Sequence, residues 1–191
     1  MLIRLLTASI FLATVALLIL QRFSMPPEFP VIDASTGETF SRGEIITTDD
    51  DYFALTIGEN NIYLAENTVL ELDRVYEDEL VVTLTKGRLL VSAQGDTPFV
   101  IETNHTDHLV HKGSASFINY DWLETIHVIP LDGSVQTTIR GTNEFLLTPT
   151  PISIHETAPV TYEPLKVSLD AGASAPFYTW TGVLTGNAPT E

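Results

Sequence analysis

Hydrophobic and polar positions follow two different patterns along the chain, with the change near residue 22. Residues 5–20 contain no charged side chain. As a helix they span roughly 24 Å, which approaches the hydrocarbon core of a bilayer once residues at either end are added. The run ends in bulky residues, LLILQRF, where a signal peptidase needs small ones. Residues 1–22 are therefore predicted to form an uncleaved transmembrane helix, with a cleaved signal peptide as the alternative.

The rest of the chain reads as short β-strands. Apolar, β-branched and aromatic residues recur in runs of four to seven residues separated by turn residues, and no amphipathic helix interrupts them. The predicted strands cover residues 52–57, 61–65, 68–73, 79–85, 88–93, 99–103, 108–112, 115–120, 125–130, 134–139, 144–148, 152–155 and 165–170.

The turns between these runs indicate an all-β domain. Asp132-Gly133 predicts a hairpin between its flanking strands, and the Thr85-Lys86-Gly87 turn predicts another. Without a βαβ rhythm, nucleotide-binding α/β folds are disfavoured. The fold class expected is all-β, a single domain built as a rolled, solenoid-like sheet or as a sandwich, preceded by one transmembrane helix.

The predicted organisation has four segments. After the anchor at 1–22, the proline-containing residues 23–42 are expected to be an extended linker. The β domain is expected at 43–170. Residues 171–191, rich in small and polar side chains, are expected to be a loosely held tail, with Trp180 either packing back or lying exposed.

Composition narrows the function. The chain has no cysteine, so disulfides and thiolate chemistry are excluded. Residues 23–191 hold all 25 acidic residues but only seven basic ones, a formal net charge of −18. Binding to nucleic acid, which needs a basic surface, is therefore disfavoured. The acidic runs 49–51 and 77–79 lack the spacing and glycine of a calcium loop and are interpreted as solvated loop charge.

Three of the five histidines lie close together, in NHTDHLVHK. On a strand, His105 and His111 share one face and lie roughly 20 Å apart, whereas His108 points the opposite way. This geometry does not place three imidazoles around one ion. The stretch is interpreted as a surface turn followed by a half-buried strand histidine, and no metal ligand is assigned.

No catalytic or cofactor-binding residue is assigned either. The chain has no GxSxG motif. With 25 acidic residues, many carboxylate pairs are possible, so such a pair is weak evidence for a glycosidase. Asn104-His105-Thr106 matches a glycosylation acceptor, a common chance match. The aromatic residues are expected to serve core packing rather than a carbohydrate platform. They are Tyr52, Phe53, Tyr63, Tyr120 and Trp122.

Residues 55–140 nevertheless carry a family-like pattern. Its elements are IYLAENTVLELDR upstream, Leu84–Gly87 with the apolar Leu89–Val91, the strand Pro98–Thr103, the segment from Leu109 through Gly113 to Phe117, and Val128 to Gly133-Ser134-Val135. This arrangement resembles the FecR-like extracytoplasmic domain of bacteria. The segment Gly113–Phe117 is one residue longer than the family spacing, which a β-bulge is expected to absorb.

The resemblance implies a non-catalytic β module anchored in the bacterial inner membrane, with its folded domain outside the cytoplasm. Few residues precede the predicted anchor, so the family's anti-sigma role is not expected to transfer. The expected function is binding or sensing of a protein or an envelope polymer. An envelope transport or assembly component that bridges to other β domains or carries an apolar ligand is the alternative, and a hydrolase comes last.

Overall fold

The structure is a computed structural model that describes residues 26–142 and 144–184. The predicted anchor at 1–22 lies outside these residues. Within them, no helix has the length and apolar character needed to cross a membrane. The regular structure of the described residues consists of strands with one short α-helix and two 3-10 turns, so the all-β prediction is confirmed.

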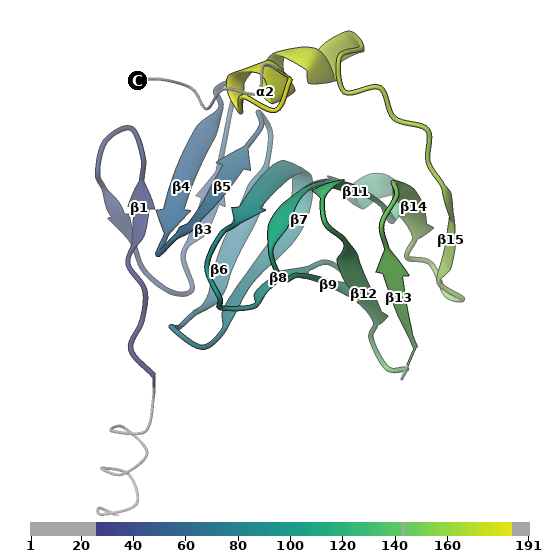
Figure 1. Cartoon of the computed structure of the whole chain (residues 1–191), viewed down its shortest axis with the longest axis horizontal. Coiled ribbons are helices and arrows are strands. Elements are labelled where there is room, and N and C mark those ends of the chain that lie inside the picture. The colour runs from purple at the N-terminus through teal and green to yellow at the C-terminus, as the bar shows by residue number, and fades with distance from the viewer. Residues whose placement is uncertain (1–25, 143, 185–191) are drawn as a thin grey trace, which may run out of the picture.

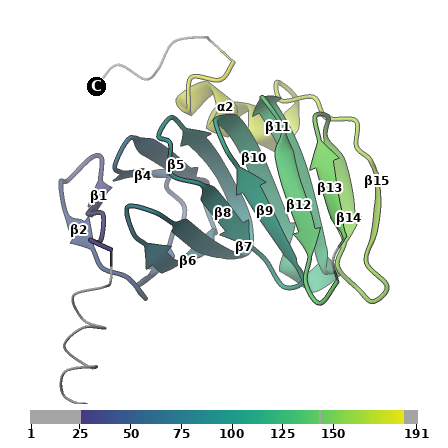
Figure 2. The ribbon, with the colours of Figure 1, turned by 60° about the horizontal axis from the view of Figure 1, so that its bottom comes forward.

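Fifteen strands form one continuous sheet that folds into two layers (Figures 1 and 2). The first layer has the order β2-β1-β4-β5-β7-β10-β11-β14-β15. Its strands are β1 (Val31–Asp33), β2 (Thr39–Phe40), β4 (Phe53–Ile57), β5 (Asn60–Leu64), β7 (Leu80–Ala93), β10 (Gly113–Tyr120), β11 (Thr125–Asp132), β14 (Ile152–His155) and β15 (Thr161–Pro164).

The second layer has the order β3-β6-β7-β8-β9-β12-β13, so β7 belongs to both layers. The further strands are β3 (Ile45–Thr47), β6 (Val69–Val75), β8 (Phe99–Glu102), β9 (Thr106–Val110), β12 (Val135–Ile139) and β13 (Phe145–Thr148). The strand pairs are antiparallel except for β7 with β8, which are parallel. Figure 1 shows the chain advancing from β1 at one end of the molecule to β13–β15 at the other.

The core lies between the two layers. The inward side chains of both layers form one cluster of buried aliphatic and aromatic residues, including Val82 and Phe99 from one layer and Val91 and Phe117 from the other. The rings of His108 on β9 and Phe117 on β10 lie 5.4 Å apart, in contact across the layers. Alternation along each strand, in which every second side chain is buried, places these residues on the inner face.

Strand β7 connects the layers by changing the phase of its alternation. Its inward residues are Leu80, Val82 and Leu84 in the first half but Leu89, Val91 and Ala93 in the second. The change falls at Gly87, which has a φ of +94°. The predicted Thr85-Lys86-Gly87 hairpin is therefore wrong: the same break in pattern marks a bend in one continuous strand of 14 residues.

The second predicted hairpin, at Asp132-Gly133, is also wrong. Strand β11 pairs with β10 and β14 in one layer, whereas β12 pairs with β9 and β13 in the other. The turn therefore crosses between layers. A β-bulge does occur nearby, but it belongs to β11, where Ser114 pairs with Asp132 and Ala115 with Pro130. The pairing of β10 with β7 runs through Gly113–Asn119 without a shift, so the extra residue predicted in this segment forms no bulge there.

Two predicted boundaries differ from those found in the structure. Strands β1 and β2 lie inside residues 23–42, predicted to be a linker, and Val31 is fully buried in the core. The β domain therefore begins before residue 43. At the other end, residues 165–170 form no strand, and β15 at Thr161–Pro164 precedes them instead.

Residues 172–184, which were predicted to belong to a loose tail, pack against the sheet instead. A short 3-10 turn (Gly172–Ser174) leads into helix α2 (Ala175–Trp180), whose Phe177 and Tyr178 are buried. The Trp180 ring contacts Tyr52 and Tyr63, with centroids 5.2 and 5.6 Å away, so it packs back onto the domain. Helix α2 thereby covers the outer face of the first layer, including Leu90.

A buried hydrogen bond between two hydroxyl groups helps to hold α2 on the sheet. The hydroxyl of Tyr178 donates a hydrogen bond to Ser116 Oγ at 2.9 Å, and both residues are buried. We expect Tyr178→Phe to lower the free energy of unfolding by about 1 kcal/mol, since this hydrogen bond is lost in the interior. Urea unfolding measures this loss. The matched change Tyr162→Phe, at an exposed tyrosine, is expected to have no measurable effect, and equal losses in both variants would contradict the docking of α2.

Candidate binding groove

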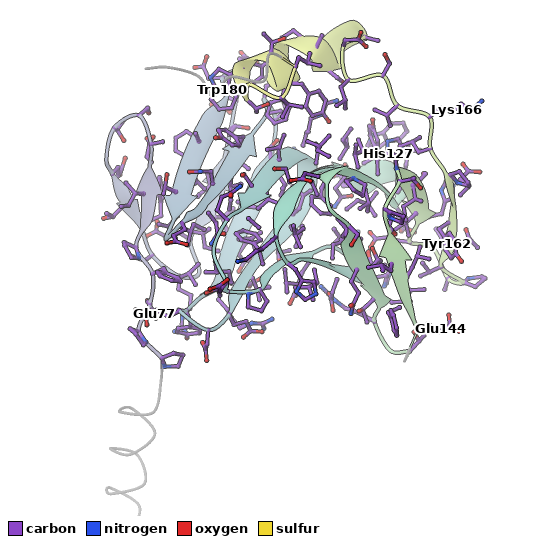
Figure 3. The ribbon with its side chains drawn as sticks, viewed as in Figure 1. Glu77, His127, Glu144, Tyr162, Lys166 and Trp180 are labelled. Carbon is purple, nitrogen blue, oxygen red and sulfur yellow. The ribbon has the colours of Figure 1, made fainter. Side chains whose placement is uncertain are left out.

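The two layers do not close at the end formed by β13 and β15. Three adjoining hollows of about 330, 370 and 160 Å³ run from the connections that precede these strands to the space between the strands themselves. The first two share Ile139, Glu144 and Val160, and the last two share Leu146 and Tyr162. Together they form one groove, which we call the end groove. Figure 3 labels Glu144, which directly precedes β13, and Tyr162 on β15.

The walls of the end groove are mainly apolar. Leu146 on β13, Ile139 on β12 and Ile154 on β14 line it together with Val160. Strand β13 alternates so that Leu146 faces the groove, whereas Phe145 and Leu147 are 68% and 59% exposed. Tyr162 on the opposite strand is also largely exposed. A cluster of exposed apolar side chains beside an apolar hollow is typical of a binding surface.

The two strands that border the groove differ in how well their outer edges are protected from pairing with another chain. Among the described strands, β13 pairs only with β12, and its residues Phe-Leu-Leu-Thr include no charge and no proline. Strand β15 pairs only with β14, but it contains Glu163 and Pro164. Charged residues and proline protect an edge strand from pairing with another chain. Strand β13 is therefore the accessible edge.

A buried chain of polar side chains leads from one end of the groove to its floor. Glu156 is fully buried, and its Oε1 accepts hydrogen bonds from the hydroxyls of Thr103 (2.5 Å) and Thr106 (2.7 Å) and from the His105 amide (3.0 Å). His108 Nε2 lies 2.9 Å from Thr106 Oγ1. The same ring reaches Thr137 through Nδ1, also at 2.9 Å, and Thr137 lines the groove.

The hydrogen-bond directions assign the tautomer of neutral His108. Because the Thr106 hydroxyl donates to Glu156, its oxygen accepts from His108 Nε2–H. Nδ1 is then free to accept the hydroxyl proton of Thr137. Burial, with a smaller contribution from the Arg140 guanidinium, lowers the pKa of His108 to about 3. The ring is thus uncharged near neutral pH, and it links Thr106 to Thr137 through hydrogen bonds without acting as an acid.

The groove is acidic at the end formed by the β12–β13 connection. Glu144 is exposed at its rim and Glu156 lies behind it. Arg140 lines the same end, but its guanidinium already bonds Glu102 at 3.0 Å and Asp107 at 2.6 Å. These ion pairs engage the Arg140 guanidinium, although Glu102 is shared with Arg74 at 2.9 Å. The exposed carboxylate of Glu144 then gives this end of the groove a negative potential.

The histidine triplet is separated by the fold. His105 and His111 are exposed, whereas His108 points into the core from the middle of β9. Its burial is complete, deeper than the half-buried position expected, because the second layer packs against Phe117 of the first. Across residues 26–142 and 144–184, no group of three or more histidine or acidic side chains is arranged to hold a metal ion.

The other residues that the sequence drew attention to lie apart from the groove. Both acidic runs are mostly exposed and lie in or beside turns. Tyr52 and Tyr63 pack around Trp180, and Phe53 packs edge-on against Phe40. Tyr120 packs edge-on against His127, while Trp122 is 77% exposed in the turn after β10. These aromatic residues form no common platform.

Comparison with known proteins adds support for the fold. Two crystal structures of a "putative anti-sigma factor" from Parabacteroides distasonis, at 2.50 and 1.65 Å resolution, are similar to this chain with a TM-score of 0.53. Sequence identity is 20% and 19%, and each likeness covers 63% of this chain and 59% of that chain. The chain thus spans less than two thirds of those structures, and at this identity the likeness shows the fold alone. No family model and no curated protein sequence matches the chain.

The groove itself was not predicted from the sequence. The pattern predicts residues 144–148 only as one strand among many, and the local sign of a sheet edge is the pair of prolines that follow it, Pro149 and Pro151. What the sequence does not reveal is that β13 faces β15 across an open end.

Proposed function

We propose that this chain is a non-catalytic, FecR-like binding and sensing module of the bacterial envelope. In this proposal residues 1–22 anchor it in the cytoplasmic membrane and the β domain works outside the cytoplasm. The resemblance of residues 55–140 to the FecR-like domain supports this view. The fold shared with the Parabacteroides distasonis structures is consistent with it.

One observation carries the binding role: the unprotected edge of β13 lies beside an apolar groove. An edge strand with free backbone groups pairs readily with an added strand, and a neighbouring apolar groove receives alternate side chains of that strand. Phe145 and Leu147 remain exposed where a partner would cover them. The proposed partner is therefore another protein of the envelope.

The same observation favours a second candidate function. An envelope transport or assembly component would use an open β edge to bridge to other β domains, and it would use the groove for an apolar ligand. The two candidates differ in what occupies the groove in the cell, a protein segment or a small apolar molecule.

Photocrosslinking in the native envelope tests the proposed function. A photoreactive phenylalanine analogue at Phe145 or at Leu147 is expected to capture a defined protein, since these side chains border the groove. The matched control is Trp122 in the turn after β10, an aromatic residue 77% exposed that lies outside the lining of the end groove. Equal labelling from Trp122 and Phe145 would contradict the proposal, and capture of lipid alone would favour the second function.

A further inference from the structure

We propose that the end groove binds an extended, basic segment of a partner protein. The segment adds as a strand to the free edge of β13 and places a lysine or arginine side chain at the Glu144 end. This inference rests on the proposed function and names the chemistry of the partner.

The walls of the groove define the apolar part of the segment. Leu146, Ile154 and Val160 face one another across the hollow. A strand added to β13 turns every second side chain toward them. The segment therefore carries apolar, β-branched residues at alternate positions, and the backbone groups of β13 supply the remaining bonds.

The charge at one end of the groove defines the basic part. Glu144 stands exposed at the rim, where a long cationic side chain reaches it. The carboxylate of Glu156 is buried behind it, and its Oε2 has no hydrogen-bond partner among the described residues. With Arg140 held by Glu102 and Asp107, the end attracts a cation.

The overall charge disfavours other occupants. The chain carries a formal net charge of −16, so a second copy is repelled as it approaches. An anionic lipid headgroup is disfavoured at the Glu144 end for the same reason. A basic protein segment is the occupant that gains from both the apolar walls and the acidic end.

Peptide binding to the full-length chain in detergent tests this inference. The probes are peptide pools of about six residues, a common strand length, with valine or isoleucine at alternate positions. One terminal residue is lysine in one pool and glutamate in the matched pool. We expect the lysine pool to bind roughly tenfold more tightly in low salt, and we expect this preference to fall severalfold in the Glu144→Gln variant. The control Glu38→Gln changes an exposed carboxylate near β2 and leaves the preference unchanged.

Backbone methylation of the peptide tests strand addition without altering the protein. N-methyl groups on the edge that faces β13 are expected to abolish binding, whereas the same groups on the outer edge are tolerated, because only one edge of an added strand bonds to the sheet.

Each alternative gives a distinct result. Equal binding of the lysine and glutamate pools overturns the basic segment, and equal tolerance of both methylation patterns overturns strand addition. If no peptide pool binds, the proposal that an extended protein segment occupies the groove is wrong. Binding of a neutral long-chain alcohol instead would identify a small apolar molecule as the occupant. A dimer that forms with increasing concentration in sedimentation would identify a second copy of the chain. The proposed function fails separately, if Phe145 captures no protein in the envelope.

Discussion

Replacing Gly87 by alanine is expected to lower the free energy of unfolding by about 3–5 kcal/mol, through backbone strain and lost hydrogen bonds. Gly87 has a φ of +94°, which L-residues rarely adopt. A Cβ atom there would lie 2.5 Å from both Cα and Oγ1 of Thr68. The clash is with backbone as well as side chain, so the strand β7 cannot bend as it does without moving Thr68.

Thr68 matters because it satisfies the backbone of the bend. Its hydroxyl accepts a hydrogen bond from the Arg88 amide at 3.0 Å and donates one to the Arg88 carbonyl at 3.1 Å. On the other side, the buried Asn119 amide donates to the carbonyls of Leu84 and Thr85. Displacing Thr68 leaves polar groups unpaired in the interior, which adds to the strain of the alanine.

Urea unfolding of the full-length chain measures this effect against a matched glycine. Gly141 also has a positive φ, +78°, but a Cβ atom there meets nothing within 4 Å. Gly141→Ala is therefore expected to cost only about 1 kcal/mol, the strain of the backbone alone. If both variants lose the same amount, close packing at the bend is not what requires glycine.

The second large effect is a loss of stability in acid that depends on His108. Burial keeps this side chain neutral and lowers its pKa to about 3, whereas the unfolded chain titrates near 6.5. Between these values the unfolded state binds more protons than the folded state, so stability falls as the pH falls. From pH 7 to about pH 4.5 the contribution of His108 is a loss of about 2–3 kcal/mol.

The substitution His108→Gln isolates this contribution. Glutamine keeps a donor and an acceptor near Thr106 and Thr137 but takes up no proton. We expect the variant to be less stable than the wild type at pH 7 and to lose that disadvantage by about pH 4.5. The control Val110→Ala, at the next inward position of β9, lowers stability equally at both pH values. A pH-independent difference for His108→Gln would mean that the imidazole is not buried neutral.

Much of the strand content followed from local pattern. Alternation in residues 99–103 and 115–120 predicted β8 and β10 closely, because one face of each strand is buried and period two is then imposed on the sequence. The two predicted hairpins failed for a common reason. A break in alternation with a glycine indicates that the chain changes direction, but not whether it folds back on itself or passes to a second layer.

The histidine stretch illustrates the same limit. The period of two correctly placed His108 and His111 on opposite sides of the chain. Nothing local indicated that His108 would be fully enclosed, because its ring contacts Phe117 of the other layer and Thr137 of β12, which come later in the chain. Depth of burial is a property of the packed layers and not of the strand.

The sequence by itself determined that this protein is a strongly acidic, cysteine-free, all-β chain, since composition and alternation are properties of the residues alone. Only the tertiary structure decided where its sheet stays open. The end groove joins β13 to β15, and the polar chain behind it joins Thr103 to Glu156, pairs that no local pattern relates. These features exist because β7 bends and carries the chain between two layers, so that strands far apart in sequence come to face each other.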